Sequence, residues 1–239
     1  MKKIIASVVA VITVATIMFT SSCQKESSTT PGSSFTSSEK VAQGMLFPSN
    51  APAVYGHTYN QWITAWWQWD LQFDCNHFPT FDTDGSLQNQ NQSGPVFFLA
   101  GSRHNATLSV TVPAGVSIFL PLATVENDYP CGDAVLDSLT SYTNDFVSGI
   151  TDLSLTIDGN SIKNLTSYQK ISSMFTYAAN ADLANCFDDC ITGSDQQWVV
   201  GGYFFIFRPL TPGSHTIVRH AVAVGGAVTY DTVYNITQL

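Results

Sequence analysis

The chain has 239 residues, of which 44% are hydrophobic and only 11% are charged, a composition that suits one globular domain with a full core. Its formal net charge is −9, and its few Lys and Arg residues do not cluster. Nucleic acids and anionic lipid head groups are therefore disfavoured as partners, because sequence-independent binding to either needs grouped positive charge.

The N-terminus has the order of a secretory signal. Two lysines at positions 2 and 3 precede an uncharged apolar run over residues 4–19, and small residues follow before Cys23. This order predicts a cleaved signal peptide over residues 1–22. A retained membrane anchor is the alternative, but the apolar run lies near the lower limit for a span.

The Ser-Ser-Cys ending resembles the lipoprotein signals of Bacteroidota, although Thr20 stands where Leu is usual. The resemblance implies that Cys23 is acylated and becomes the first residue of the mature protein. Several acyl chains anchor a protein firmly, since each buried methylene contributes about 0.8 kcal/mol. We therefore expect an exported protein attached to the bacterial outer membrane, on the cell surface or on its periplasmic face. Without Lys2 and Lys3, seven basic residues remain against eighteen acidic ones, a net charge of −11.

Residues 23–40 are rich in Ser, Thr, Pro and Gly and have almost no apolar side chains. Such a segment cannot bury a core and acts as a flexible tether. The sequence thus predicts a lipidated Cys23, a tether to residue 40, and a single β-rich globular domain over residues 41–239.

The segment YNQWITAWWQWD, residues 59–70, predicts an amphipathic helix that extends to Phe73. Thr58 and Gln61 have the spacing of a capping box at its start. One face carries the aromatic and aliphatic side chains Tyr59, Trp62, Ile63, Trp66, Trp69 and Phe73, widened by Trp67 and Leu71. Such a stripe is more often core than an exposed surface for stacking sugars, so Trp62, Trp66 and Trp69 are candidate binding residues only as the second interpretation.

Asp70 falls within the apolar arc of this helix. A buried carboxylate is costly unless it is paired or hydrogen-bonded, so Asp70 is either a satisfied structural group or a cavity group with catalytic use. Arg208, at the end of a very apolar strand, is the expected ion-pair partner of Asp70 or Glu126 and a further candidate binding residue.

Strand patterns dominate the rest of the chain. The predicted strands cover residues 96–100, 107–112, 116–123, 153–157, 198–207, 215–224 and 229–236. One further helical stretch is predicted over residues 133–147. Many short strands at regular spacing indicate an antiparallel β-sandwich or jelly-roll-like domain with a Trp-rich helix and one helical insertion.

Four cysteines remain after Cys23, an even number in an exported chain, and predict two disulfides. They are Cys75, Cys131, Cys186 and Cys190, and three pairings are open. A C-x3-C metal site at the last two lacks a nearby His. The sequence predicts no metal site and no cofactor.

Several separate blocks resemble, in the same order, a family of exported bacterial proteins. They are WWQW on the helix, SGPVFFLAG at 93–101, VPAGVSIFLPL at 112–122, and RPLTPGSHTI at 208–217. The resemblance covers most of the chain after Gly56 and implies no particular chemistry. Thr124 stands where that family is expected to have Asn.

Recognisable nucleophile, phosphate-loop and zinc-protease motifs are absent from the sequence. Paired carboxylates are the remaining catalytic possibility. Glu126 and Asp128 follow the strand 116–123, where a loop could face a cleft together with Asp70, as in enzymes that cleave glycosidic bonds between two carboxyl groups.

The leading interpretation is a lipid-anchored envelope protein whose domain is a binding or accessory module, with a glycan as ligand by analogy with other exported sandwiches. The first alternative is a hydrolase or lyase acting on a surface polysaccharide through the paired carboxylates. The second is a structural envelope protein. Enzymatic activity is not favoured over binding.

Overall fold

A computed structural model describes residues 36–102, 105–131, 135–226 and 228–239. The predicted signal peptide, the lipidation site Cys23 and most of the tether lie outside the described residues. Helix α1 (Ser37–Gly44) begins inside the segment that the composition assigned to the tether, with a capping box between Thr36 and Glu39. Among the described helices, none is long and apolar enough to span a bilayer.

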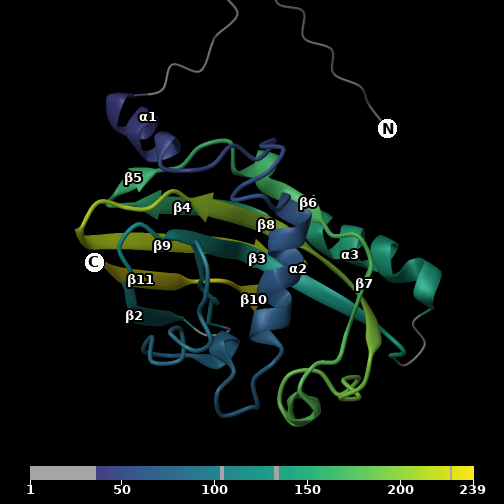
Figure 1. Cartoon of the computed structure of the whole chain (residues 1–239). Coiled ribbons are helices and arrows are strands. Elements are labelled where there is room, and N and C mark those ends of the chain that lie inside the picture. Colours follow the sequence, from purple (N-terminus) through teal and green to yellow (C-terminus); the bar gives the residue numbers. More distant parts are fainter. Residues whose placement is uncertain (1–35, 103–104, 132–134, 227) are drawn as a thin grey trace, which may run out of the picture. The chain divides into compact units, whose positions relative to one another are not determined.

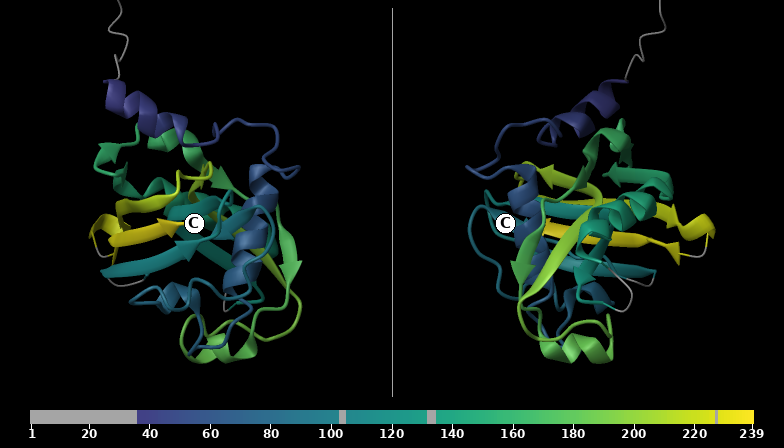
Figure 2. Two further views of the ribbon diagram at one scale, coloured as in Figure 1. Left: turned by 60° about the vertical axis from the view of Figure 1, so that its left-hand side comes forward. Right: turned by 90° about the vertical axis from the view of Figure 1, so that its right-hand side faces the viewer.

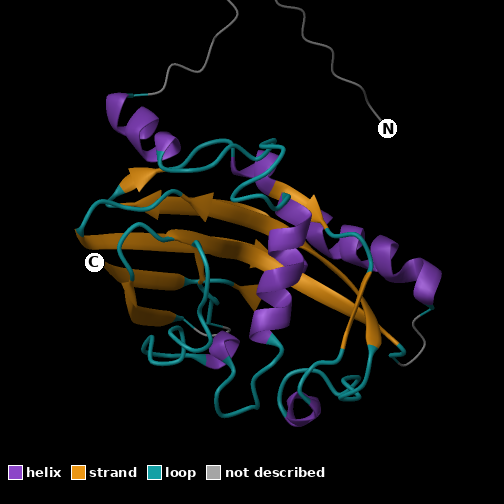
Figure 3. Ribbon diagram, viewed as in Figure 1, coloured by secondary structure: helices purple, strands orange, loops and turns teal. Residues whose placement is uncertain are grey.

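Two mixed sheets form a β-sandwich (Figures 1 and 3). The first contains β1 (Val96–Phe98), β3 (Ser117–Tyr129), β8 (Gln196–Phe207), β6 (Gln169–Ile171) and β7 (Phe175–Tyr177). The second contains β2 (Ala106–Val112), β11 (Thr232–Gln238), β9 (Gly213–Ala223), β4 (Thr151–Ile157), β5 (Asn160–Ser161) and β10 (Val228–Thr229). The predicted sandwich is confirmed. Its pairings are antiparallel except between β1 and β3 and between β2 and β11, which are parallel.

The burial of each strand follows its hydrophobic pattern. Every second residue is buried along β11 and on β9 from Ile217 onward, so the second sheet packs one face into the core. β8 is buried along nearly its whole length, and so is the first half of β3, because both faces of the first sheet are covered.

Helix α2 (Tyr59–Asp70) has the predicted Thr58–Gln61 capping box but ends three residues before Phe73. Its apolar face is core, as the periodicity predicts. The indole N–H groups of Trp62, Trp66 and Trp69 donate to the carbonyl oxygens of Val54, Leu99 and Gln90 at 2.8, 3.0 and 2.8 Å. Because each indole N–H has an acceptor, the three rings can be buried without leaving a hydrogen-bond donor unsatisfied.

The helix predicted over residues 133–147 is α3 (Leu139–Ser148), which begins later than predicted and is preceded by the 3-10 turn η2 (Leu136–Ser138); residues 133 and 134 lie outside the described residues. It packs against β3 and β8, where a Cβ on Gly201 would lie 2.6 Å from Thr143 Cγ2 of the helix. α2 and α3 lie on either side of β8 (Figure 2, right). The remaining helical turns are η1 (Pro79–Phe81), η3 (Leu165–Tyr168), η4 (Ala181–Asn185) and η5 (Val224–Gly226).

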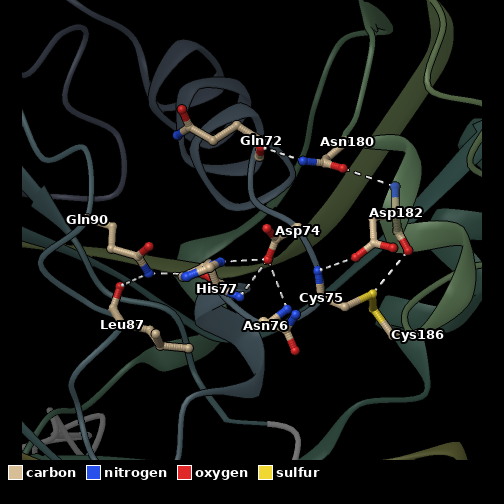
Figure 4. A network of polar contacts seen from close by, with 10 residues as sticks. All are labelled: Gln72, Asp74, Cys75, Asn76, His77, Leu87, Gln90, Asn180, Asp182 and Cys186. Carbon is tan, nitrogen blue, oxygen red and sulfur yellow. Dashed lines mark hydrogen bonds and ion pairs between the residues drawn. A yellow bond between two sulfur atoms is a disulfide. The ribbon is translucent and has the colours of Figure 1, made fainter.

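Two disulfides form, and the structure resolves the pairing as Cys75–Cys186 and Cys131–Cys190. Both therefore join distant segments to the loop after η4. Around the first, the Cys75 amide donates to Asp182 Oδ2 at 3.0 Å, and Asn180 Nδ2 donates to the carbonyl oxygen of Gln72 at 3.2 Å (Figure 4). The end of α2 and the η4 loop are thus tied together by covalent and polar contacts. Because Cys186 and Cys190 belong to different disulfides, neither offers a thiolate to a metal.

Candidate functional site

The principal cavity has a volume of about 440 Å³ and lies where α2, β3, β9, β10 and the η4 loop meet. Its aromatic and apolar walls come from Trp66, Trp67, Pro121, Val125, Phe146, Phe187, Val228 and Tyr230. Its polar lining comes from Thr80, Ser102, Thr124, Glu126, Thr229 and Arg219, with Gly101 beside them. An apolar hollow of this size with a few polar groups is the usual form of a small-molecule site.

Two adjacent tryptophans of α2 form one wall of the cavity. The rings of Trp66 and Trp67 meet edge to face with centroids 5.1 Å apart, and Trp67 packs at 6.5 Å against Phe187. Trp67 is only 4% exposed, yet its indole N–H has no hydrogen-bond partner in the described part of the chain. A buried donor without a partner costs free energy, so an acceptor that reached this N–H would relieve that cost.

Asp70 lies behind the cavity rather than in its lining. The side chain is fully buried, and its Oδ2 accepts a hydrogen bond of 2.6 Å from the Thr80 hydroxyl. Thr80, on η1, does line the cavity. Asp70 therefore contacts the cavity through a lining residue, whose hydroxyl it holds by this bond.

Arg219 brings a positive charge to the cavity from the buried face of β9. Its guanidinium donates from Nε to Thr232 Oγ1, from Nη1 to the carbonyl oxygens of Pro121 and Leu122, and from Nη2 to that of Ser102. These bonds are 2.8–3.3 Å long. They attach β9 to β3 at the bulge where the β3–β8 register shifts.

The prediction that Glu126 and Asp128 lie on a loop is wrong, because β3 continues through both residues to Tyr129. β8 supplies a partner for this extension, pairing Glu126 with Val200 and Asp128 with Trp198. Residues two apart on a strand share a face, so both carboxylates point the same way. Glu126 lines the cavity, whereas Asp128 lies deeper and is 3% exposed.

Asp128 belongs to an acidic group with Glu126 and Asp188, whose carboxylate oxygens lie within 4.8 Å of one another. Burial, reinforced by the negative charge of Asp188, raises the pKa of Asp128 from 3.8 to about 6. Gln196 Nε2 donates a hydrogen bond to its Oδ2 and offsets part of this effect.

We expect Asp128→Asn to stabilise the protein at alkaline pH. The folded state holds the Asp128 proton more tightly than the unfolded state, whose pKa is near 3.8, so the native protein loses stability as pH rises from about 4 to about 6. At pH 8 the substitution should add about 2 kcal/mol to the free energy of unfolding, and near pH 4 the difference should vanish. Urea unfolding across this range measures it. A loss of stability at pH 8 would contradict the expectation and would mean that the ionised carboxylate is compensated.

The ion pair expected between Arg208 and Asp70 or Glu126 is wrong. Arg208 is exposed, and its guanidinium lies 4.3 Å from the centre of the Phe47 ring. The strand that precedes it ends at the molecular surface, so its side chain does not enter the core. Of the other candidate binding residues, Trp66 lines the cavity, whereas Trp62 and Trp69 are buried in the core outside the lining.

The sequence interpretation missed several lining residues, chiefly Trp67, Thr80 and Arg219. Arg219 had a visible signal, since it alternates with Ile217 and Ala221 on the apolar face of its strand. Thr80 lies in a polar connection without periodicity, and no local pattern could place it here. Thr124, where the resembling family is expected to have Asn, also lines the cavity and donates its hydroxyl to the Gly201 carbonyl at 2.8 Å.

No protein-family model matches the chain, and no curated protein matches it. Two solved structures show a remote likeness. "Structure of PbICP-C in complex with falcipain-2" has 11% identity and a TM-score of 0.23, covering 61% of this chain and 100% of that one. "Solution Structure of Amebosin" has 12% identity and a TM-score of 0.21, covering 62% and 100%. TM-scores this low carry no argument about fold or function.

Proposed function

We propose that this protein is a lipid-anchored lipoprotein of the bacterial outer membrane whose β-sandwich domain binds a carbohydrate in the principal cavity. The observation that carries the binding role is the cavity itself, in which Trp66, Trp67 and Tyr230 surround a few fixed polar groups. Aromatic faces pack against the apolar faces of sugars, and the polar groups suit hydroxyls. The membrane attachment rests on the signal-like N-terminus and Cys23, and the two disulfides are in keeping with an exported protein.

A hydrolase or lyase acting on a surface polysaccharide is the second candidate. Glu126 lines the cavity, and Asp128, two residues further on, has a pKa raised to about 6, which suits a group that exchanges protons near neutral pH. Against this role, Asp128 lies outside the lining and is hydrogen-bonded to Gln196. A structural envelope protein without a ligand is the third reading.

One titration separates these functions. The full-length protein, solubilised in detergent, is mixed with a panel of oligosaccharides while tryptophan fluorescence and the release of reducing ends are followed. We expect a change in fluorescence without release, because two indoles line the cavity.

Glu126→Gln, with Glu39→Gln as the matched control on α1 outside the cavity, tests the enzymatic alternative. Release that is lost in Glu126→Gln and kept in Glu39→Gln would establish an enzyme. If no oligosaccharide of the panel changes the fluorescence and none releases reducing ends, the binding proposal is overturned in favour of a structural role.

A further inference from the structure

Arg219 is a buried charge that has no carboxylate partner among the residues that the structure describes. It is 3% exposed, and it forms no ion pair with any carboxylate in the described part of the chain. Its hydrogen-bond acceptors among the described residues are three carbonyl oxygens and one hydroxyl, all neutral. An arginine stays protonated in proteins, and a charge removed from water is costly unless an opposite charge approaches it.

Two hydrogen-bond donors on residues that line the cavity have no acceptor among the described residues. A guanidinium has five N–H groups, and the four bonds of Arg219 leave one hydrogen on Nη2. The buried N–H of Trp67, which lines the same cavity, is a second such donor. Unused donors of this kind are complementary to an oxygen-rich acceptor.

The absence of a side chain at Gly101 leaves space for the Arg219 guanidinium. A Cβ on Gly101 would lie 1.6 Å from Arg219 Nη2, so only glycine leaves room for the charged group beside the cavity lining. Glu126 lies further along β3 than the backbone groups that Arg219 contacts. Arg219 bonds the carbonyls of Pro121 and Leu122, and the backbone of Glu126 lies about 13 Å beyond that of Leu122 at the usual rise per residue. An anionic group is thus favoured at the Gly101 side of the cavity.

We propose that the cavity recognises the carboxylate of an acidic sugar, such as a uronic acid, with Arg219 supplying the charge and the Trp67 N–H a directional donor. Charge-assisted hydrogen bonds are about twice as strong as neutral ones, so a carboxylate gains more at this position than a hydroxyl does. The aromatic wall of Trp66 and Trp67 packs against the sugar ring. This inference rests on the proposed carbohydrate-binding function and names its ligand class.

The test uses ligand pairs that differ at one group, which is a charged carboxylate in one member and a neutral carboxamide in the other. Ligand-observed NMR titrations of the full-length protein compare D-glucuronate with D-glucuronamide, and D-galacturonate with D-galacturonamide. We expect at least one acid to bind about tenfold more tightly than its amide, a difference that corresponds to about 1.4 kcal/mol, and the preference should shrink at high salt. Trp67→Phe, which removes the N–H together with the five-membered ring and keeps one aromatic ring in the wall, should weaken the acid about fivefold to tenfold and should weaken the amide less.

Trp62→Phe is the matched control, because the Trp62 N–H donates to Val54 outside the cavity lining and its loss should leave the affinity unchanged. Arg219→Gln should abolish the preference for acid over amide; if that variant does not fold, the ligand pairs decide alone. Equal binding of acid and amide in both pairs would overturn the carboxylate inference while leaving the carbohydrate function standing. If neither these ligands nor the oligosaccharide panel bind, both the carboxylate inference and the proposed carbohydrate function are overturned.

Discussion

Gly202→Ala should destabilise the protein by at least about 4 kcal/mol, at the upper end of single substitutions. Gly202 lies in β8 opposite Thr124 with a φ of 152°. A Cβ there would lie 2.2 Å from the Ala123 carbonyl oxygen and 2.7 Å from Thr124 Cα. Both atoms belong to the backbone of β3, which cannot move aside because the residues on either side of it are packed in the core.

The control is Gly213→Ala, which separates backbone strain from the steric clash. Gly213 also has a positive φ, 129°, but a Cβ there meets nothing within 4 Å. Its cost should stay near 1–2 kcal/mol. Urea unfolding gives both values, and a Gly202→Ala variant no less stable than Gly213→Ala would show that the bulge relaxes. Thr124 and Glu126 line the cavity and follow the β3 bulge between Pro121 and Ala123. Any Gly202→Ala protein that still folds should therefore also bind the ligand more weakly.

Removal of the Cys75–Cys186 disulfide, by Ala at both positions, should lower the free energy of unfolding by about 3–5 kcal/mol. The bond closes a segment with a sequence separation of 111 residues, and cross-links over long loops restrict the unfolded chain most. It also positions Phe187, which packs against Trp67 and contacts Phe78 at 4.9 Å between ring centroids. We therefore expect weaker ligand binding as well as lower stability.

Removing Cys131–Cys190 is the comparison, since its sequence separation is 59 residues. The chain-entropy model gives it a value only about 0.5 kcal/mol smaller. The two effects should not add fully, because both bonds hold the same loop after η4. A loss below about 1 kcal/mol for either pair, measured by urea unfolding, would mean that the polar network in Figure 4 and the core hold the loop without the covalent link.

Local patterns predicted the elements that depend on periodicity and capping. The Thr58–Gln61 box and the apolar stripe identified α2 as a core helix, and seven strand patterns matched strands of the two sheets. The apolar run ending at residue 123 did not reveal that β3 continues to Tyr129. Asn127 and Asp128 have poor strand propensity, and pairing with β8 overrides it.

The amino-acid sequence by itself determined the class of fold, the burial of the Trp-rich helix and the presence of two cross-links, because hydrophobic period, caps and cysteine parity are local or countable properties. Only the tertiary structure decided which cysteines pair, that Arg208 lies at the surface, and that Arg219 joins Trp67 and Thr80 around one cavity. These facts depend on contacts between residues far apart in the chain. The physical reason is that register and the meeting of distant segments are settled by packing of the whole core, which no short window of sequence contains.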